Sequence, residues 1–295
     1  MTATDSQVTD AVTPYKNRRT DVPGGTEVRR YISLAAAVRT VRDQKLRLAL
    51  VDYLRQTYDP FEGSVPMAEI NNRVVIFSGH YHNRSMWQQV APHFSMEVKL
   101  AETQDPWERV QRINRAKILS THVGCWTYGH ESEGMWRLYC SDDDVRGRGV
   151  ALQTTLEKLE ASVRRYDVAV SPIHYRYYHE VDPRGFDDAL DQFFHKRMGF
   201  AHENEVRLVK QNAEHFNRLI APDARTGNVP EPSPGGMPDH LALDDWDPTV
   251  IEEITISPYA DDDYEADVRD AMARAGSVIP VERSVLDPRR FRAQY

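Results

Sequence analysis

The stretch Glu203-Asn204-Glu205-Val206-Arg207-Leu208 (ENEVRL) alternates charged and uncharged residues along its whole length. Successive side chains of a β-strand point to opposite faces, so this pattern predicts a strand over residues 203–210. Its two apolar residues would face the core, while Glu203, Glu205 and Arg207 would share the opposite face.

The two carboxylates of this predicted strand need a neighbour that compensates their charge. Carboxylates about 7 Å apart along a strand repel each other unless water, an arginine or a cationic ligand faces them. One interpretation is a solvated strand face on which Arg207 neutralises Glu205. The other is a Glu-x-Glu pair in a cleft, where one carboxylate stabilises a sugar oxocarbenium ion and the second orients an acceptor. Both interpretations stay open at the level of sequence.

The rest of the chain consists of short strands mixed with helices. Alternating or β-branched segments predict strands at residues 26–34, 45–51, 73–79, 121–128, 149–154, 168–175, 251–257 and 278–281. Periodicity and capping residues predict helices at residues 34–44, 105–120, 135–139, 156–165, 186–198 and 264–275. The strands do not alternate regularly with helices, so we expect an α+β fold with a mixed central sheet and helices packed on it.

The predicted domain organisation is simple. Residues 1–25 are polar and end in Val-Pro-Gly-Gly, which is typical of a flexible N-terminal arm. Residues 26–295 are expected to form a single α+β domain with a helical insertion at about residues 80–120. Residues 221–249 contain six prolines and three glycines, and this composition predicts an irregular loop.

Composition and charge exclude several classes of protein. The chain has 295 residues, 40% hydrophobic and 28% charged, which is typical of a globular protein and excludes collagen-like chains. The formal charge of −8 provides no general basic field, so nucleic acid is not an expected partner except as an acceptor. The N-terminus lacks the pattern of a signal peptide, and no window approaches the about 18 apolar residues of a membrane span. We therefore expect a cytoplasmic protein without membrane contact.

Familiar motifs for metals and nucleotides do not occur. The eleven histidines form neither a His-Glu-x-x-His nor a Cys-x-x-Cys pattern, so we expect no metal site. The absence of Gly-x-Gly-x-x-Gly, Walker and Gly-x-Ser-x-Gly motifs argues against dinucleotide dehydrogenases, P-loop NTPases and α/β-hydrolases. With only two cysteines there is no disulfide framework, and Cys125 is expected to be a buried structural thiol.

Two further predicted strands carry candidate polar side chains. In residues 124–128 (GCWTY), Trp126 and Tyr128 share one face and are expected to pack, whereas the Thr127 hydroxyl on the other face can brace a neighbouring carboxylate. Arg29 and Arg30 are consecutive in the first strand, so one of them must point inward. An inward arginine requires a carboxylate or a phosphate.

Six short segments follow one another along the chain: Arg30-Tyr31, Asp59-Pro60-Phe61-Glu62, Cys125-Trp126-Thr127, Met135-Trp136-x-x-Tyr139, Gly149-Val150 and Glu203-x-Glu205-x-Arg207. In this order they resemble a bacterial domain-of-unknown-function family, number 2971. That family typically shows a "KY" start, then "NDPFE", "CFS", "MWxxY", a "GV" strand and "YExEWR", and the resemblance covers roughly residues 28–260. This sequence departs from the pattern at Tyr58, at Trp126-Thr127 and at His202.

A second resemblance suggests chemistry. The order Arg30, Thr127 and then Glu203-x-Glu205 before an apolar strand is similar to the ADP-ribosyltransferase fold of the Arg–Ser–Glu type, which has a split sheet. The resemblance implies that Glu205 binds the nicotinamide-ribose 2′-hydroxyl and stabilises the oxocarbenium transition state. It further implies that Glu203 positions the acceptor and that Thr127 orients Glu205.

The same resemblance implies a dinucleotide site. NAD would be the substrate, Arg30 would hold its pyrophosphate, and Tyr31 or Tyr128 would stack on nicotinamide. The acceptor of the transferred group is left open.

Two other classes of function are alternatives to a transferase. In a Mg²⁺-dependent nuclease, Glu203, Glu205 and Asp59 would hold the metal, although Arg207 stands where a catalytic lysine is expected. In a non-enzymatic partner-binding or sensor domain, the charged strand would have only a structural role and the partner would be another protein.

Overall fold

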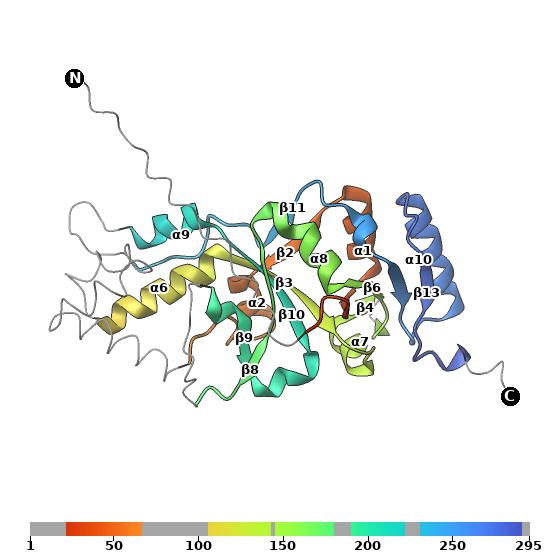
Figure 1. Ribbon diagram of the computed structural model, residues 1–295, viewed down its shortest axis with the longest axis horizontal. Coiled ribbons are helices and arrows are strands. Elements are labelled where there is room, and N and C mark those ends of the chain that lie inside the picture. The colour runs from red at the N-terminus through yellow and green to blue at the C-terminus, as the bar shows by residue number, and fades with distance from the viewer. Residues whose placement is uncertain (1–21, 67–105, 143–144, 180–189, 222–230, 291–295) are drawn as a thin grey trace, which may run out of the picture.

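Nine strands form one central sheet in the computed structural model, which describes residues 22–66, 106–142, 145–179, 190–221 and 231–290 (Figure 1). The main path through the sheet is β11-β2-β3-β1-β6-β12-β13, and β10 and β7 extend it from β3. Every pair is antiparallel except β12 with β13, so the predicted α+β class with a mixed central sheet is confirmed. The strands are β1 (Glu27–Ile32), β2 (Leu46–Leu50), β3 (Thr121–Tyr128), β6 (Val150–Thr155), β7 (Ala169–Pro172), β10 (Glu205–Gln211), β11 (His240–Leu243), β12 (Glu253–Ile256) and β13 (Val281–Arg283).

Helices and two small sheets surround the central sheet. Helices α6 and α9 lie side by side at one end of the molecule, and α10 with β13 lies at the other (Figure 1). The helices are α1 (Leu34–Asp43), α2 (Val51–Thr57), α6 (Pro106–Ser120), α7 (Glu133–Tyr139), α8 (Leu156–Val163), α9 (Ala213–Ile220) and α10 (Asp262–Arg274). The small sheets are β4 (Ser141–Asp142) with β5 (Val145–Arg146), and β8 (His174–Arg176) with β9 (His195–Arg197). The 3-10 helices are η3 (Arg164–Tyr166), η4 (Asp191–Phe194), η5 (Met198–Glu203), η6 (Pro248–Val250) and η7 (Pro288–Arg290).

Four of the described α-helices, namely α1, α8, α9 and α10, begin where a polar side chain caps them, and Asn212 caps α9. The side chain of Ser33 accepts a hydrogen bond from the backbone of the first turn of α1, and Thr155 does the same for α8. Asp261 caps α10 by accepting from the backbone N–H of Tyr264 at 2.8 Å. These caps satisfy N–H groups that have no partner within the helix, so the predicted helices 34–44, 156–165 and 264–275 are confirmed with small shifts of their ends.

Strand β3 has a divided edge. On one side it pairs with β10 along residues 121–127. On its other side it pairs with β2 at residues 122–123 and with β1 at residues 127–128. Residues 124–126 thus pair with neither β1 nor β2, and the sheet is split between these two described strands.

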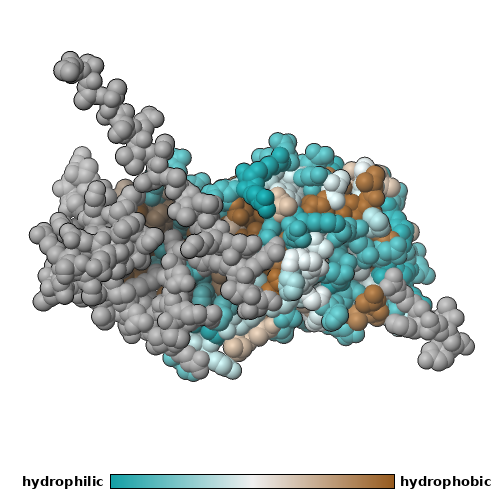
Figure 2. Space-filling view, in the orientation of Figure 1, coloured by the Kyte–Doolittle hydropathy of each residue, from teal (hydrophilic) through white to brown (hydrophobic). Residues whose placement is uncertain are grey.

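The two faces of the sheet differ in chemistry. One face is continuously apolar: Val28, Leu48, Trp126, Leu152 and Val206 lie under α1, α8 and α10. The opposite face carries two smaller apolar clusters, one around η4 and one around α7. The outer surface in view is mostly hydrophilic over the described residues, and its apolar side chains form small separate patches (Figure 2). The period-two pattern of the strands accounts for the apolar face, because alternate residues point the same way.

Several expected elements differ from the structure. The described part of the predicted helix 186–198 is instead η4, β9 and the start of η5. Part of the predicted loop 221–249 forms β11, which pairs with β2, and α2 forms at residues 51–57, where no helix was predicted. Tertiary pairing overrides local propensity in these short segments. Residues 1–21 of the expected arm 1–25, the strand at 73–79 and the part of the expected insertion 80–120 that precedes residue 106 lie outside the described residues.

We expect Gly149→Ala to destabilise the protein by about 1–3 kcal/mol, because the added methyl group has no space. A Cβ at this position would lie 2.7 Å from the carbonyl oxygen of Ile32 and 2.9 Å from Cys140. Gly25→Ala is the matched control, since nothing lies within 4 Å of its Cβ position. Thermal unfolding of both variants separates the clash from the entropy change common to glycine-to-alanine substitutions. Equal stability of the two variants would contradict the prediction.

Candidate functional site

A buried group of charged side chains lies on the face of the sheet opposite the apolar face, between the two smaller apolar clusters. We call it the ion cluster. Each member is less than a tenth exposed, which is rare for charged side chains unless they are paired. The ion cluster consists of Glu62, Lys196, Glu203, Glu205 and Arg207.

Arg207, which is fully buried, is the centre of the ion cluster. Its Nε donates to Glu205 Oε1 at 2.7 Å, and its Nη2 donates to Glu205 Oε2 at 3.1 Å. Its Nη1 donates to Glu62 Oε1 at 2.6 Å and to the carbonyl oxygen of Phe193 at 2.8 Å. The planar guanidinium thus joins β10 to the loop that follows α2.

Lys196 joins the two carboxylates of the Glu-x-Glu motif. Its Nζ lies 2.5 Å from Glu203 Oε2 and 3.0 Å from Glu205 Oε2. The hydroxyl of Tyr139, on α7, donates to Glu203 Oε1 at 2.5 Å. Side chains from three elements, α7, β9 and β10, therefore contact the two carboxylates.

The two glutamates do not share a strand face as predicted. Glu203 is the last residue of η5, and β10 begins only at Glu205. Between them Asn204 adopts a left-handed conformation with φ 42°, which asparagine tolerates better than most residues. Because of this turn, the Glu203 carboxylate contacts Lys196, a contact that the alternation of side chains along a strand does not predict.

The cations of the cluster keep Glu205 ionised. Burial alone would raise the pKa of Glu205, but Arg207 and Lys196 outweigh it and lower that pKa to about 2. Burial would lower the pKa of Lys196, but the surrounding carboxylates, Glu205 first among them, raise it. Burial and the Glu203 carboxylate raise the pKa of Tyr139, so its hydroxyl stays a hydrogen-bond donor at neutral pH.

Arg29, Thr127 and Glu205 lie in one row across three strands. Thr127 on β3 is the direct partner of Arg29 on β1 and of Glu205 on β10. Residues directly opposite each other on neighbouring strands share a face, with Cβ atoms about 4.5–5.5 Å apart. All three are buried, with exposed fractions of 8%, 7% and 2%. We call this set the Arg–Thr–Glu row.

Arg29 retains hydrogen-bonding capacity in this row. Its guanidinium donates to the carbonyl oxygen of Gly129, and its Nη2 lies 2.6 Å from Glu27 Oε2. Its buried Nε has no hydrogen-bond partner among the described residues. A buried N–H group without a partner is unusual, and it is available to an anionic ligand.

The three predicted cofactor-binding residues make other contacts, although Tyr31 lies on the same face of β1 as Arg29. Arg30 follows Arg29 and therefore points to the opposite face, where its Nη2 donates to the carbonyl oxygen of Arg47 across the split in the sheet. Tyr31 is buried and packs edge-on against Trp136, with 4.8 Å between the ring centroids. Tyr128 packs against the continuous apolar core. The structure therefore brings Glu203, Glu205 and Thr127 together but not these three side chains.

Solvent reaches the middle of the sheet at Cys125. This residue is exposed, although its cross-strand partner Arg207 and the nearby Glu205 are buried. Solvent therefore reaches the face of the sheet that carries the Arg–Thr–Glu row at this residue. The expectation of a buried Cys125 is wrong, and the buried thiol is Cys140.

Sequence reasoning missed several members of the site. Lys196 lies in a segment that was expected to be helical, and Arg30 was predicted as the anion-binding arginine in place of its neighbour Arg29. Glu62 stood in the Asp-Pro-Phe-Glu segment and was signalled only by the family resemblance. Asp59 of the same segment pairs with Arg197 at 2.9 Å rather than with the glutamates, which removes the expected third ligand of a nuclease site.

The described residues contain no group of three or more histidine, cysteine, aspartate or glutamate side chains arranged to hold a metal ion. None of the helices in the described ranges combines the length and the apolar character needed to span a bilayer. No protein-family model, curated protein or solved structure matches the chain. The geometry of the site is therefore the basis for the function proposed below.

Proposed function

We propose that the Arg–Thr–Glu row binds and cleaves NAD, and that the protein is an enzyme similar to the ADP-ribosyltransferases of the Arg–Ser–Glu type. The observation that carries this proposal is the register that aligns Arg29, Thr127 and Glu205 close to the exposed Cys125. The split between β1 and β2 is in keeping with it. Membership of family 2971, suggested by the motif order, is part of the same proposal.

In the proposed reaction Glu205 acts as an anion throughout. Its lowered pKa keeps the carboxylate charged, as a group must be to stabilise positive charge on the ribose. The bond between the ribose C1′ and the nicotinamide nitrogen breaks, and its electron pair leaves with nicotinamide. The acceptor or a water molecule then bonds to C1′ and gives up its proton, which the nearby Glu203 carboxylate can take.

The other residues of the row orient the substrate. Arg29, with its unpartnered Nε, is the residue we assign to the pyrophosphate, in place of Arg30. Thr127 pairs with both Arg29 and Glu205, and we assign its hydroxyl to orienting Glu205. Lys196 holds Glu203 and Glu205 at a fixed separation, so the site is ordered before the substrate arrives.

One observation favours a second candidate, a non-enzymatic partner-binding domain. Both carboxylate oxygens of Glu205 already accept hydrogen bonds from Arg207 or Lys196. In that case the ion cluster only fixes β10 against the loop after α2. The two candidates differ in whether NAD reaches the row.

The test measures nicotinamide release from millimolar NAD by chromatography. We expect release by the wild type and a loss of about a hundredfold or more in Glu205→Gln, because the transition state loses its anionic partner. Glu253→Gln, a strand glutamate on β12, is the matched control and should retain activity. In parallel, NAD should slow alkylation of the exposed Cys125, while the buried Cys140 stays unmodified as a control for folding.

Two results would overturn the transferase proposal. One is the absence of both nicotinamide release and protection of Cys125, even with cell lysate supplied as a source of acceptors. The other is equal release by the wild type and Glu205→Gln. Either result would favour the partner-binding domain.

A further inference from the structure

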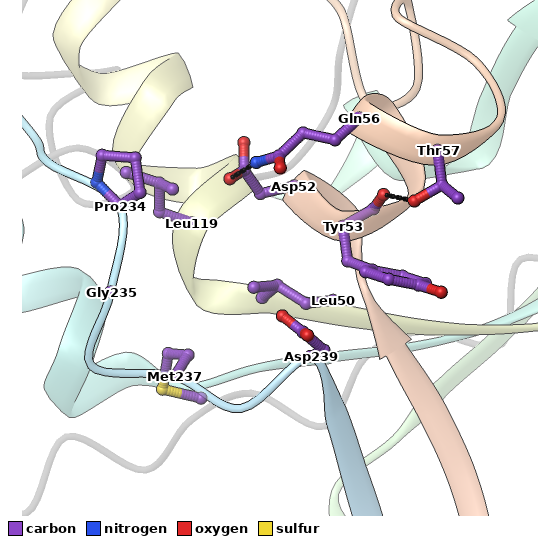
Figure 3. A pocket seen from close by; sticks show the side chains of 10 residues that line it. All are labelled: Leu50, Asp52, Tyr53, Gln56, Thr57, Leu119, Pro234, Gly235, Met237 and Asp239. Atoms are coloured by element: carbon purple, nitrogen blue, oxygen red, sulfur yellow. Dashed lines mark hydrogen bonds between the residues drawn. The ribbon is translucent and has the colours of Figure 1, made fainter.

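A second cavity lies away from the ion cluster, between α2 and residues 234–239, which we call the strap. Figure 3 shows its lining, with α2 on one side and the strap on the other. Its volume is about 390 Å³, within the range of about 300–1,000 Å³ typical of small-molecule sites. We call it the α2 pocket.

We propose that the α2 pocket binds a small organic cation, namely a primary ammonium group on an apolar or aromatic stem. This inference is independent of the NAD reaction proposed above. It rests on the charge of the lining, on the fixed position of one carboxylate and on the apolar surface beside it.

The lining offers negative charge and hydrogen-bond acceptors. It contains the carboxylates of Asp52 and Asp239 but no lysine, arginine or histidine among the described residues. The hydroxyl of Thr57 donates to the carbonyl oxygen of Tyr53 at 2.6 Å, so toward a ligand its oxygen acts as an acceptor. An ammonium group, with three donors and no acceptor, complements such a lining.

The two carboxylates have different roles. Asp52 is buried and already engaged, because its Oδ1 pairs with Arg115 at 2.6 Å and its Oδ2 accepts from Gln56 at 2.8 Å. Asp239 is exposed and forms no ion pair with any other described residue. Asp239 is therefore the carboxylate left to compensate a cation in the α2 pocket.

The backbone fixes Asp239 in place. Its carbonyl oxygen accepts from the N–H of Leu50 at 2.7 Å, and the next residue, His240, starts β11 in register with Ala49. Further back along the strap, the carbonyl oxygen of Pro238 lies 2.8 Å from His122 Nε2. The carboxylate thus projects from an anchored segment, and Figure 3 shows it directed toward the side chain of Leu50.

Apolar side chains provide a surface for the stem of the ligand. Leu50 and Leu119 are buried, and Met237 is half-buried on the strap. The ring of Tyr53 is half-buried and lies 5.2 Å from that of His240. A methionine thioether and a tyrosine ring both favour contact with an aromatic group, so an arylalkyl amine suits the pocket better than a short alkyl amine.

The test is calorimetric titration of the full chain with 2-phenylethylammonium. Two isosteres of similar shape, neutral 2-phenylethanol and anionic 3-phenylpropionate, separate the effect of charge from that of the apolar stem. We expect the cation to bind measurably more tightly than either isostere, and more weakly as salt is added. Asp239→Asn should weaken it about tenfold, since it removes one charge-assisted contact.

The control is Asp263→Asn, which removes an exposed carboxylate from α10 and should leave binding unchanged. Absence of binding by the cation, equal binding of the three probes, or equal weakening by the two variants would each overturn the proposal. None of these readouts involves NAD, so failure here is distinguishable from failure of the proposed transferase activity.

Discussion

Replacing Arg207 by methionine is expected to lower the free energy of unfolding by about 3–5 kcal/mol. The substitution keeps much of the apolar volume but leaves the carboxylates of Glu62 and Glu205 buried with less compensating charge. Glu62 would then have no ion pair with another described residue, and the carbonyl oxygen of Phe193 would lose a donor. Urea unfolding at neutral pH measures the loss.

The control for this experiment is Arg274→Met. Arg274 also pairs with an acidic residue, Asp270, but the two side chains are 70% and 61% exposed. Exposed pairs contribute little because water and salt screen them, so the control should change the unfolding free energy by less than about 1 kcal/mol. If the two variants were equally stable, the ion cluster would not be the buried support that we describe.

The second large expected effect is a loss of folding stability at acidic pH. The pKa of Glu205 is about 2 in the folded protein, below its ordinary value of 4.5. The unfolded chain therefore binds a proton more readily than the folded one, so this group stabilises the fold above about pH 4.5 and the contribution is lost as pH falls toward 2. We expect the unfolding free energy to fall by up to about 1.4 kcal/mol per pH unit in this window because of Glu205.

Urea unfolding at a series of pH values, on the wild type and Glu205→Gln, isolates that contribution. The variant lacks the titrating group, so its stability should decline less steeply between pH 4.5 and 2, while other acidic groups titrate in both proteins alike. Glu253→Gln serves as the control and should keep the wild-type slope. Parallel curves for the wild type and Glu205→Gln would show that Arg207 and Lys196 do not hold the carboxylate as described.

Local patterns predicted much of the framework. Residues 121–128 are predicted as a strand and form β3 with the same bounds, because all of the required information lies in neighbouring residues. The capped helices α1, α8 and α10 follow for the same reason. The misassigned segment 186–198 mixes apolar and charged residues, and its described part divides into elements of only a few residues each. Such short segments are ambiguous between helix and strand until their partners are known.

The site was predictable only in part. The Glu-x-Glu pair and the strand hydroxyl of Thr127 are visible in the sequence, and the structure places Glu205 opposite Thr127 and joins Glu203 to Glu205 through Lys196. The choice between Arg29 and Arg30 depends on which of two adjacent residues faces Thr127, and a shift of one residue in register reverses it. That register is determined by the pairing of Arg29 with Thr127, about a hundred positions away, and not by the Arg-Arg dipeptide itself.

The sequence by itself determined which residues alternate, where helices begin and which side chains are apolar, because these properties depend on residues within a few positions of each other. Only the tertiary structure decided which charges meet. Arg207 and Glu62 are 145 positions apart, and Lys196 reaches both glutamates only because of the left-handed turn at Asn204. The energy of a buried ion pair depends on distance and on exclusion of water, and both arise only when distant segments pack together.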